Sequence, residues 1–145
     1  MTDLAMCRRA YADEIDALCK LKTRALVDAL ATVPRETFLP PGPWLVRSDR
    51  DIQRPRQTED ADPRRVYHNH AIAIDPERQL FNGVPSFLLS MIDALAIAPG
   101  SRILHLGSGP GYYTALMAHV VGSRGRILAI EVDPDLAQQA THNLA

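Results

Sequence analysis

The sequence has only two cysteines, Cys7 and Cys19, among its 145 residues. Their separation fits neither a zinc knuckle nor a CxxC redox pair, which excludes the common cysteine-based metal and disulfide sites. His68 and His70 alternate along one predicted strand, but no third ligand lies nearby at a telling spacing. We therefore expect no metal site, and we interpret both cysteines as helix-packing residues.

Long apolar runs and an excess of charge are also missing. The chain has 16 Lys and Arg against 17 Asp and Glu, a formal net charge of -1, so no general attraction to nucleic acid or acidic membranes is expected. Residues 1–18 mix charged and small apolar side chains, which fits neither a signal-peptide core nor a membrane span. The default expectation is a cytoplasmic protein that binds neither nucleic acid nor membrane.

The most informative stretch runs from Ser101 to Pro134. Residues 102–106 form a short apolar run, residues 112–121 have the length and composition of a crossover helix, and residues 126–132 form a second apolar run. Continuously apolar strands separated by a helix are typical of a parallel sheet that is covered on both faces. The predicted fold class is α/β, with half of a nucleotide-binding sheet.

Gly107, Gly109 and Gly111 occupy alternate positions directly after the first apolar run. Glycine lets the backbone turn sharply out of a strand and lets a ligand approach with no Cβ in the way. A dinucleotide fingerprint needs a sixth-position glycine where this chain has Tyr112, which disfavours a nicotinamide cofactor and a pyrophosphate. Glu131 ends the second run, where its carboxylate can accept hydrogen bonds from two ribose hydroxyls. Adenosine without a diphosphate indicates S-adenosyl-L-methionine.

A resemblance to a known family covers most of the chain, from Val33 to Leu144. The motifs are, in order, VPRETFLPPGPW, YHNHAIAID, NGVPS, PGSRILHLGSGPGYYTA and ILAIEVDP. This order resembles the protein-L-isoaspartate O-methyltransferase family, for which VPRE-x-F-x-P ahead of such a glycine turn is the most specific element. The resemblance implies a partial Rossmann-like class I methyltransferase fold with an N-terminal helical region. It also implies methylation of isoaspartyl residues in damaged proteins, as a repair reaction.

The predicted cofactor site spans the glycine turn and the ends of both apolar runs. At its edge, His105 stands where most S-adenosylmethionine enzymes carry an acidic residue that helps to hold the ammonium group of the cofactor. A neutral imidazole can accept one hydrogen bond, whereas a protonated one repels the cofactor, so we expect weaker or pH-sensitive affinity. The predicted residues are His105, Leu106, Gly107, Ser108, Gly109, Gly111, Tyr112, Glu131 and Val132.

The acceptor side is expected on the loop that reads QLFNGVPS, where Asn82-Gly83 signals a turn and Pro85 suits the first turn of a helix. The resembled family carries T-I-S-x-P here, with a serine that contacts methyl donor and isoaspartyl substrate. Alignment on Pro85 puts Gly83 in place of that serine. Asn82 or Ser86 is the expected replacement. The departure leaves open a methyltransferase for another peptide or for a small-molecule acceptor.

Two segments are expected along the chain. Residues 1–65 form an N-terminal helical cap with a charged loop, and residues 66–145 form the first half of the S-adenosylmethionine-binding α/β domain. Helical periodicity extends from about Leu4 to Leu30 as one long or two shorter helices, Trp44 is expected in the core, and residues 47–65 are interpreted as a solvated loop. A strand is expected from about residue 66 to 74.

A complete domain of this class has more strands than the ones predicted here, so the first strand would expose an unpaired apolar edge. We expect the chain to be a fragment of a longer enzyme, a chain that a partner chain or an oligomer completes, or a degenerate remnant that acts as a non-catalytic binding module. On each reading, the isolated residues should be weakly stable and show little or no turnover.

Overall fold

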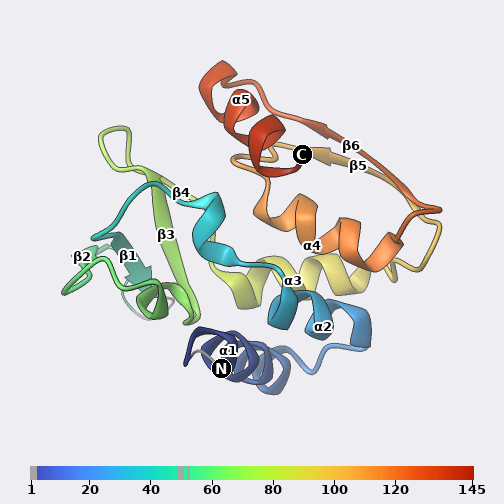
Figure 1. Cartoon of the computed structure of the whole chain (residues 1–145), viewed down its shortest axis with the longest axis horizontal. Helices are drawn as coiled ribbons and strands as arrows, with labels where there is room; N and C mark the ends of the chain where they lie inside the picture. The colour runs from blue at the N-terminus through green and yellow to red at the C-terminus, as the bar shows by residue number, and fades with distance from the viewer. Residues whose placement is uncertain (1–2, 49–50, 52) are drawn as a thin grey trace.

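The structure is a computed structural model that describes residues 3–48, 51 and 53–145. Figure 1 shows a central group of helices with an antiparallel sheet on one side and a parallel strand pair on the other. The helices are α1 (Asp3–Cys19), α2 (Arg24–Thr32), α3 (Pro85–Ala94), α4 (Tyr112–Val121) and α5 (Pro134–Asn143), with short 3-10 helices η1 (Arg35–Phe38) and η2 (Pro63–Val66). The strands are β1 (Leu45–Ser48), β2 (Arg56–Gln57), β3 (His70–Asp75), β4 (Leu80–Phe81), β5 (Arg102–Leu106) and β6 (Arg126–Ile130).

The N-terminal helical region forms two shorter helices, which is one of the two arrangements that the periodicity predicts. Lys20 has a positive φ of 52° and ends α1. The carboxylate of Asp93 on α3 accepts the backbone N–H groups of Lys22 at 2.9 Å and Thr23 at 2.8 Å. The break between α1 and α2 is therefore held by a side chain that lies far away in the sequence.

The hydrophobic core lies where α1, α2, η1 and α4 meet. Full burial of an aliphatic side chain stabilises the fold by about 1.5–3 kcal/mol relative to exposure. Trp44, which was predicted to be buried, is 5% exposed and donates its indole N–H to the carbonyl of Pro40 at 2.7 Å. Residues buried in this core include Tyr11, Ile15, Leu26, Leu30, Phe38, Ile72, Leu89, Tyr112 and Leu116.

The antiparallel sheet has the strand order β2-β1-β3-β4. β1 pairs with β3, so this sheet joins residues on both sides of the predicted boundary between residues 65 and 66. The strand predicted from residue 66 begins only at His70, because residues 63–66 form η2 under the Asp62 cap. The prediction that His68 and His70 alternate on one strand is therefore wrong. Within the described residues, no group of three or more His, Cys, Asp or Glu side chains could hold a metal ion.

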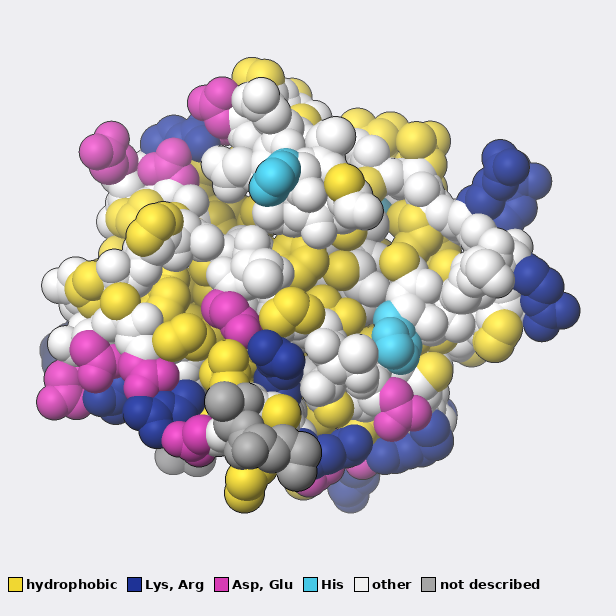
Figure 2. Space-filling model, viewed as in Figure 1, with side chains coloured by type: hydrophobic (Ala, Val, Ile, Leu, Met, Phe, Trp, Pro, Cys, Tyr) yellow, Lys and Arg dark blue, Asp and Glu magenta, His cyan; other side chains and the backbone are white. Residues whose placement is uncertain are grey.

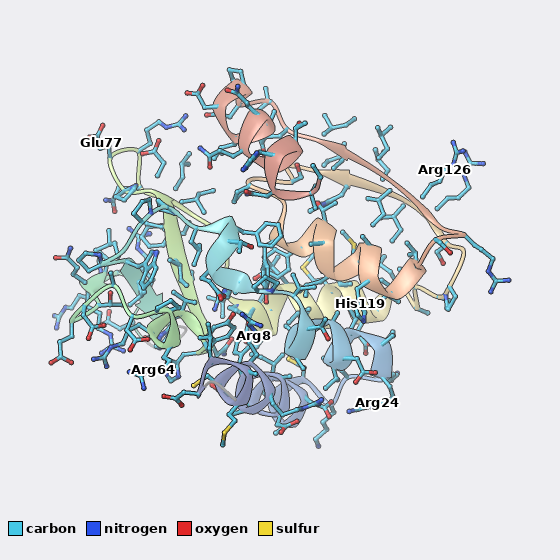
Figure 3. The ribbon with its side chains drawn as sticks, in the orientation of Figure 1. Arg8, Arg24, Arg64, Glu77, His119 and Arg126 are labelled. Atoms are coloured by element: carbon cyan, nitrogen blue, oxygen red, sulfur yellow. The ribbon has the colours of Figure 1, made fainter. Side chains whose placement is uncertain are left out.

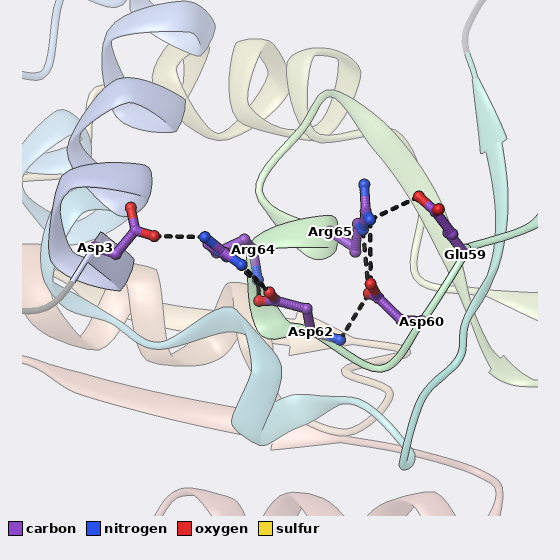
Figure 4. A network of polar contacts seen from close by, with 6 residues as sticks. All are labelled: Asp3, Glu59, Asp60, Asp62, Arg64 and Arg65. Carbon is purple, nitrogen blue, oxygen red and sulfur yellow. Dashed lines mark hydrogen bonds and ion pairs between the residues drawn. The ribbon is translucent and has the colours of Figure 1, made fainter.

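The segment predicted as a solvated loop is mostly exposed, but β2, η2 and a network of charged side chains give it structure. Figure 4 shows Arg64 between Asp62 and Asp3, and Arg65 beside Glu59 and Asp60. A single exposed ion pair stabilises a protein by about 0–1 kcal/mol. The network nevertheless links η2 to the first turn of α1.

β5 and β6 pair in parallel, in register from Arg102 opposite Arg126 to Leu106 opposite Ile130. This confirms the predicted strand, helix and strand, although β6 ends two residues before the predicted limit at residue 132. Alternate residues face α4 and are half-buried, while the opposite face lies open to solvent. We call this opposite face the open face; it consists of Leu104, Leu106, Leu128 and Ile130, which are 58%, 66%, 62% and 47% exposed.

The prediction that both faces of the parallel sheet are covered is thus wrong for the described residues. Hydrophobic side chains gather along the edge of the molecule over β5 and β6 (Figure 2). The physical reason is that α4 packs on one face of the pair only. No helix in the described part of the chain is both long and apolar enough to cross a bilayer.

Candidate functional site

The glycine turn between β5 and α4 forms the centre of the candidate site. Gly107 has a φ of +71° and Gly109 one of +55°, values that residues with side chains rarely adopt. A Cβ added at Gly107 would meet no atom within 4 Å, and one at Gly109 would meet only Ile74 Cδ1, at 3.7 Å. The outer side of the turn therefore offers open space to a ligand.

Gly111 differs from the other two glycines. A Cβ there would lie 3.2 Å from the Leu144 side chain and 3.6 Å from Ala140 Cα. Its φ of +100° places it as the N-cap of α4. The structure thus puts Gly111 against α5, where it allows close packing, and not on the open side of the turn.

The carboxylate of Glu131 lies directly on the turn. Its Oε2 accepts the backbone N–H of Gly109 at 2.8 Å, and its Oε1 accepts that of Asp133 at 3.0 Å. These two donors, Asp133 first, hold the pKa of Glu131 below its ordinary value, so the group is ionised at neutral pH. A carboxylate has about four acceptor positions, so Glu131 retains capacity for further donors at the carboxyl ends of β5 and β6.

His105 faces α4 from β5. Its Nδ1 lies 2.8 Å from the hydroxyl oxygen of Thr114, and the two share one hydrogen. Burial lowers the pKa of the imidazole below its ordinary 6.5, although Glu131 acts in the opposite direction. The side chain is therefore neutral at pH 7 and adds no positive charge beneath the turn.

The remaining predicted cofactor residues divide into three places. Leu106 belongs to the open face, and Val132 is 94% exposed just beyond β6. Ser108 is buried within the turn, where its carbonyl accepts the N–H of Gly111 at 3.1 Å. Tyr112 is only 2% exposed, and its ring packs on Phe38 with centroids 5.6 Å apart. The Tyr112 ring therefore belongs to the core and not to the open side.

The predicted acceptor residues are both held by β3 and the residues before it. Asn82 Oδ1 accepts the N–H of Ile72 at 2.9 Å. Ser86 Oγ accepts the amide of Asn69 at 2.9 Å, and the Ser86 N–H donates to Asn69 Oδ1 at 2.9 Å. As predicted, α3 begins at Pro85. Asn69, which is 7% exposed, was missed because its position between two histidines gives no sign of a pairing with Ser86, 17 residues away.

Gly83 occupies the position of the serine in the resembled T-I-S-x-P motif. It has a φ of +80°, and a Cβ there would lie 2.6 Å from Leu88 Cδ1. A serine therefore does not fit this loop as it stands. Any hydroxyl or amide for the acceptor must come from a neighbouring residue.

Arg78, in the turn between β3 and β4, was also missed. Its guanidinium pairs with Asp75 at 2.6 Å and with Asp133, which caps α5. In Figure 3 this turn is located by the label of Glu77, and the start of β6, away from Asp133, by that of Arg126. The contact ties the antiparallel sheet to the residue that donates to Glu131, through a separation of 55 positions that no local pattern reveals.

Comparison with known proteins gives one consistent family. The sequence model of the protein-L-isoaspartate(D-aspartate) O-methyltransferase family matches residues 48–145. The chain is similar to the protein-L-isoaspartate O-methyltransferase of Methanothrix thermoacetophila, with 30% identity over 130 residues, 90% of this chain and 52% of that protein. Similarity to the enzyme of the same name from Aeropyrum pernix reaches 33% over 122 residues, 84% of this chain and 39% of that protein.

Solved structures agree on the fold. A protein-L-isoaspartate O-methyltransferase from Plasmodium falciparum, in complex with S-adenosyl-L-homocysteine, superposes with a TM-score of 0.66 at 17% identity, over 94% of this chain and 54% of that one. A second structure of that enzyme name gives 0.59 at 20% identity, over 92% of this chain and 38% of that one. The likeness confirms a class I methyltransferase fold with N-terminal helices. The chain spans about half the length of the curated relatives that it matches. It belongs to the protein-L-isoaspartate(D-aspartate) O-methyltransferase family.

Proposed function

We propose that this chain carries the methyl-donor side of an S-adenosyl-L-methionine-dependent methyltransferase that acts on the side carboxylate of isoaspartyl residues in damaged proteins. The observation that supports this most is the Glu131 carboxylate, 2.8 Å from the N–H of Gly109 at the carboxyl ends of two parallel strands. Ligands of open α/β sheets bind at this edge.

The residues of the turn fit the cofactor. The open side of Gly107 and Gly109 leaves room for an adenosyl group, and the spare acceptor positions of Glu131 suit the two hydroxyls of a ribose. A neutral His105 does not repel a positively charged ligand. When bound, S-adenosyl-L-methionine supplies a methyl group that its sulfonium already activates.

The acceptor side needs hydrogen-bond donors, because a carboxylate is ionised at neutral pH and only accepts. Asn82 Oδ1 and Ser86 Oγ already accept bonds from Ile72 and Asn69. What Asn82 and Ser86 still offer is the amide NH2 group and the hydroxyl proton. Both are donors. No general base is required, and orientation of donor and acceptor can contribute about 7–11 kcal/mol to such a reaction.

Calorimetric titration of the chain with S-adenosyl-L-homocysteine tests the donor side. We expect Glu131→Gln to weaken binding by about tenfold or more, since the amide keeps the shape but loses charge and acceptor positions. Asp135→Asn is the matched control, because Asp135 is exposed in the first turn of α5 and should leave affinity unchanged. Absence of binding heat in the wild type, or equal affinity in Glu131→Gln, contradicts the proposal.

A second candidate is a methyltransferase for another peptide or for a small-molecule acceptor. Gly83 favours it, because this position lacks the hydroxyl of the family serine and its positive φ disfavours a side chain. Titration of the S-adenosyl-L-homocysteine complex with an isoaspartyl peptide and its normal aspartyl isomer separates the two. Preference for the isoaspartyl peptide supports the first candidate, and equal binding supports the second. A chain that binds no cofactor and is unaffected by Gly109→Val would instead be a non-catalytic binding module.

We further propose that the protein acts in the cytoplasm and that a partner chain or a second copy covers the β5 edge. The two free thiols, Cys7 and Cys19, suit a reducing compartment. Within the described residues β5 has only β6 beside it, and unpaired strand edges are normally covered in folded proteins. Sedimentation of the chain over a concentration series tests the second point.

A further inference from the structure

Arg35, the arginine of the VPRE motif, is completely buried. Its guanidinium donates to three backbone carbonyls: Val66 at 2.7 Å, His68 at 3.0 Å and His70 at 2.7 Å. Arginine is rarely buried unless it is paired. A group this costly to bury is a candidate for a specific structural task.

The charge of Arg35 has an unusual environment. In the described part of the chain no carboxylate forms an ion pair with it, and the adjacent Glu36 binds Arg8 and Tyr67. Instead, the guanidinium carbon lies 5.5 Å from the ring centroid of Tyr11 and 5.8 Å from that of Tyr112. Ring faces at such distances attract a cation, and more so away from water.

One side of Arg35 holds the acceptor residues in place. The three carbonyls flank Asn69, whose side chain binds both the N–H and the hydroxyl of Ser86. The same segment continues into β3, where the Ile72 N–H binds the side chain of Asn82. Both predicted acceptor residues are therefore anchored to the stretch of backbone that Arg35 holds.

The other side of Arg35 lies against the start of α4, next to the glycine turn. Tyr112, which its guanidinium contacts, is the first residue of α4 directly after the glycine turn. Phe38 of the same 3-10 helix packs against the same ring at 5.6 Å. A shift of Arg35 would thus move the start of α4, and with it Gly109 and the turn.

We propose that Arg35 is a positioning residue that sets the placement of the glycine turn relative to Asn82 and Ser86, so that one guanidinium fixes the spacing of methyl donor and acceptor. The assignment of one side to the methyl acceptor and the other to the methyl donor rests on the proposed function. The contacts through which Arg35 joins the two sides do not depend on it. Arginine suits the task because its planar fork reaches several carbonyls in fixed directions, which the compact ammonium of lysine does not.

Amide hydrogen exchange followed by NMR tests the link without any ligand. In Arg35→Lys we expect the amides of Ser86 and Gly109 both to exchange about tenfold faster or more, while the Lys22 amide, held by Asp93 on α3, keeps its rate. Arg9→Lys is the matched control, since Arg9 is 49% exposed in a surface pair with Asp13 and should change none of the three. Faster exchange of Ser86 alone, or of all three amides equally, overturns the proposal.

Asn69→Ala keeps the test decisive if Arg35→Lys does not fold. This variant removes only the hydrogen bonds to Ser86, so exchange should rise at Ser86 and stay unchanged at Gly109. A rise at both amides overturns the proposal. Affinity for S-adenosyl-L-homocysteine should fall about tenfold in Arg35→Lys and stay within about twofold in Asn69→Ala. A wild type that binds no S-adenosyl-L-homocysteine defeats the proposed function, while the exchange result still decides the role of Arg35.

Discussion

β3 and the β5–β6 pair are similarly apolar in sequence but differ in burial. In β3, Ala71, Ile72 and Ala73 are 5%, 0% and 1% exposed. In β5 and β6, residues alternate between half-buried and exposed, and none is fully buried. An apolar run therefore predicts that a strand forms, whereas its burial depends on which elements lie over each face.

The two regions also differ in what holds them in place. β3 is anchored by the core and by direct hydrogen bonds from Arg35, whereas the glycine turn beside β5 is held by a few polar contacts, chiefly Glu131 with Gly109 and Arg78 with Asp133, and only indirectly by Arg35, through Tyr112. Segments with few buried apolar contacts open locally at lower free energy. The candidate cofactor site is thus built in the less stable part of the chain.

The largest expected effect comes from truncating one leucine in the core and one on the open face. Leu116 on α4 is 0% exposed, so Leu116→Ala should lower the free energy of unfolding by about 2–5 kcal/mol. Leu104 on the open face is 58% exposed, so Leu104→Ala should change it by less than about 0.5 kcal/mol. Urea unfolding of both variants and the wild type measures the difference.

A comparable loss in Leu104→Ala would show that the open face is covered in solution, for example by a second copy of the chain. Repeating the unfolding at several protein concentrations identifies that case, because self-association makes stability depend on concentration. The difference in burial between β3 and the β5–β6 pair would then hold only for the monomer.

The next effect concerns the α5 cap. The Asp133 carboxylate accepts the N–H groups of Asp135 at 3.0 Å and Leu136 at 3.1 Å and also binds Arg78. Asp133→Ala should lower the free energy of unfolding by about 0.5–2 kcal/mol. Asp28→Ala, at an exposed position within α2, is the control and should have little effect. If both variants lose equally, the cap does not stabilise the parallel region.

The open face allows a smaller and more direct test. Replacing Leu106 and Leu128 by lysine places charge where both side chains are more than half exposed. Unfolding free energy should change by less than about 0.5 kcal/mol per site, while binding of a hydrophobic dye should fall. Unchanged dye fluorescence would mean that another apolar surface dominates, and a large loss of stability would mean that the face is packed.

Local signals account for much of the parallel region. Glycine at 122 ends α4, Asp133 and Pro134 begin α5, and Pro85 begins α3, each through backbone geometry that acts within a few residues. The glycine turn and the position of Glu131 followed from the spacing of a strand, helix and strand. These features need no knowledge of distant contacts.

The antiparallel region was harder to predict, because it depends on contacts between residues that are distant in the sequence. β1 is short and runs into a charged segment, and its partner β3 follows more than twenty residues later. No local signal marks Arg35 as buried, because arginine is usually exposed; its burial depends on carbonyls 31–35 positions away. The open face was missed because periodicity describes a strand and not its neighbours.

The smallest expected effect is a pH dependence carried by His105 in the parallel region. Burial lowers the folded-state pKa of this imidazole below its ordinary 6.5, so below that pH the unfolded chain binds more protons than the folded one. The stabilisation is complete above about pH 6.5 and is lost as pH falls toward the folded-state pKa. Urea unfolding at about pH 7.5 and 5.5 should therefore show a smaller loss in His105→Gln than in the wild type. His142→Gln, at an exposed position on α5, should keep the wild-type dependence. An unchanged loss of stability in His105→Gln would mean that other groups bind the protons. The His105 imidazole would then be less buried than its contact with Thr114 indicates.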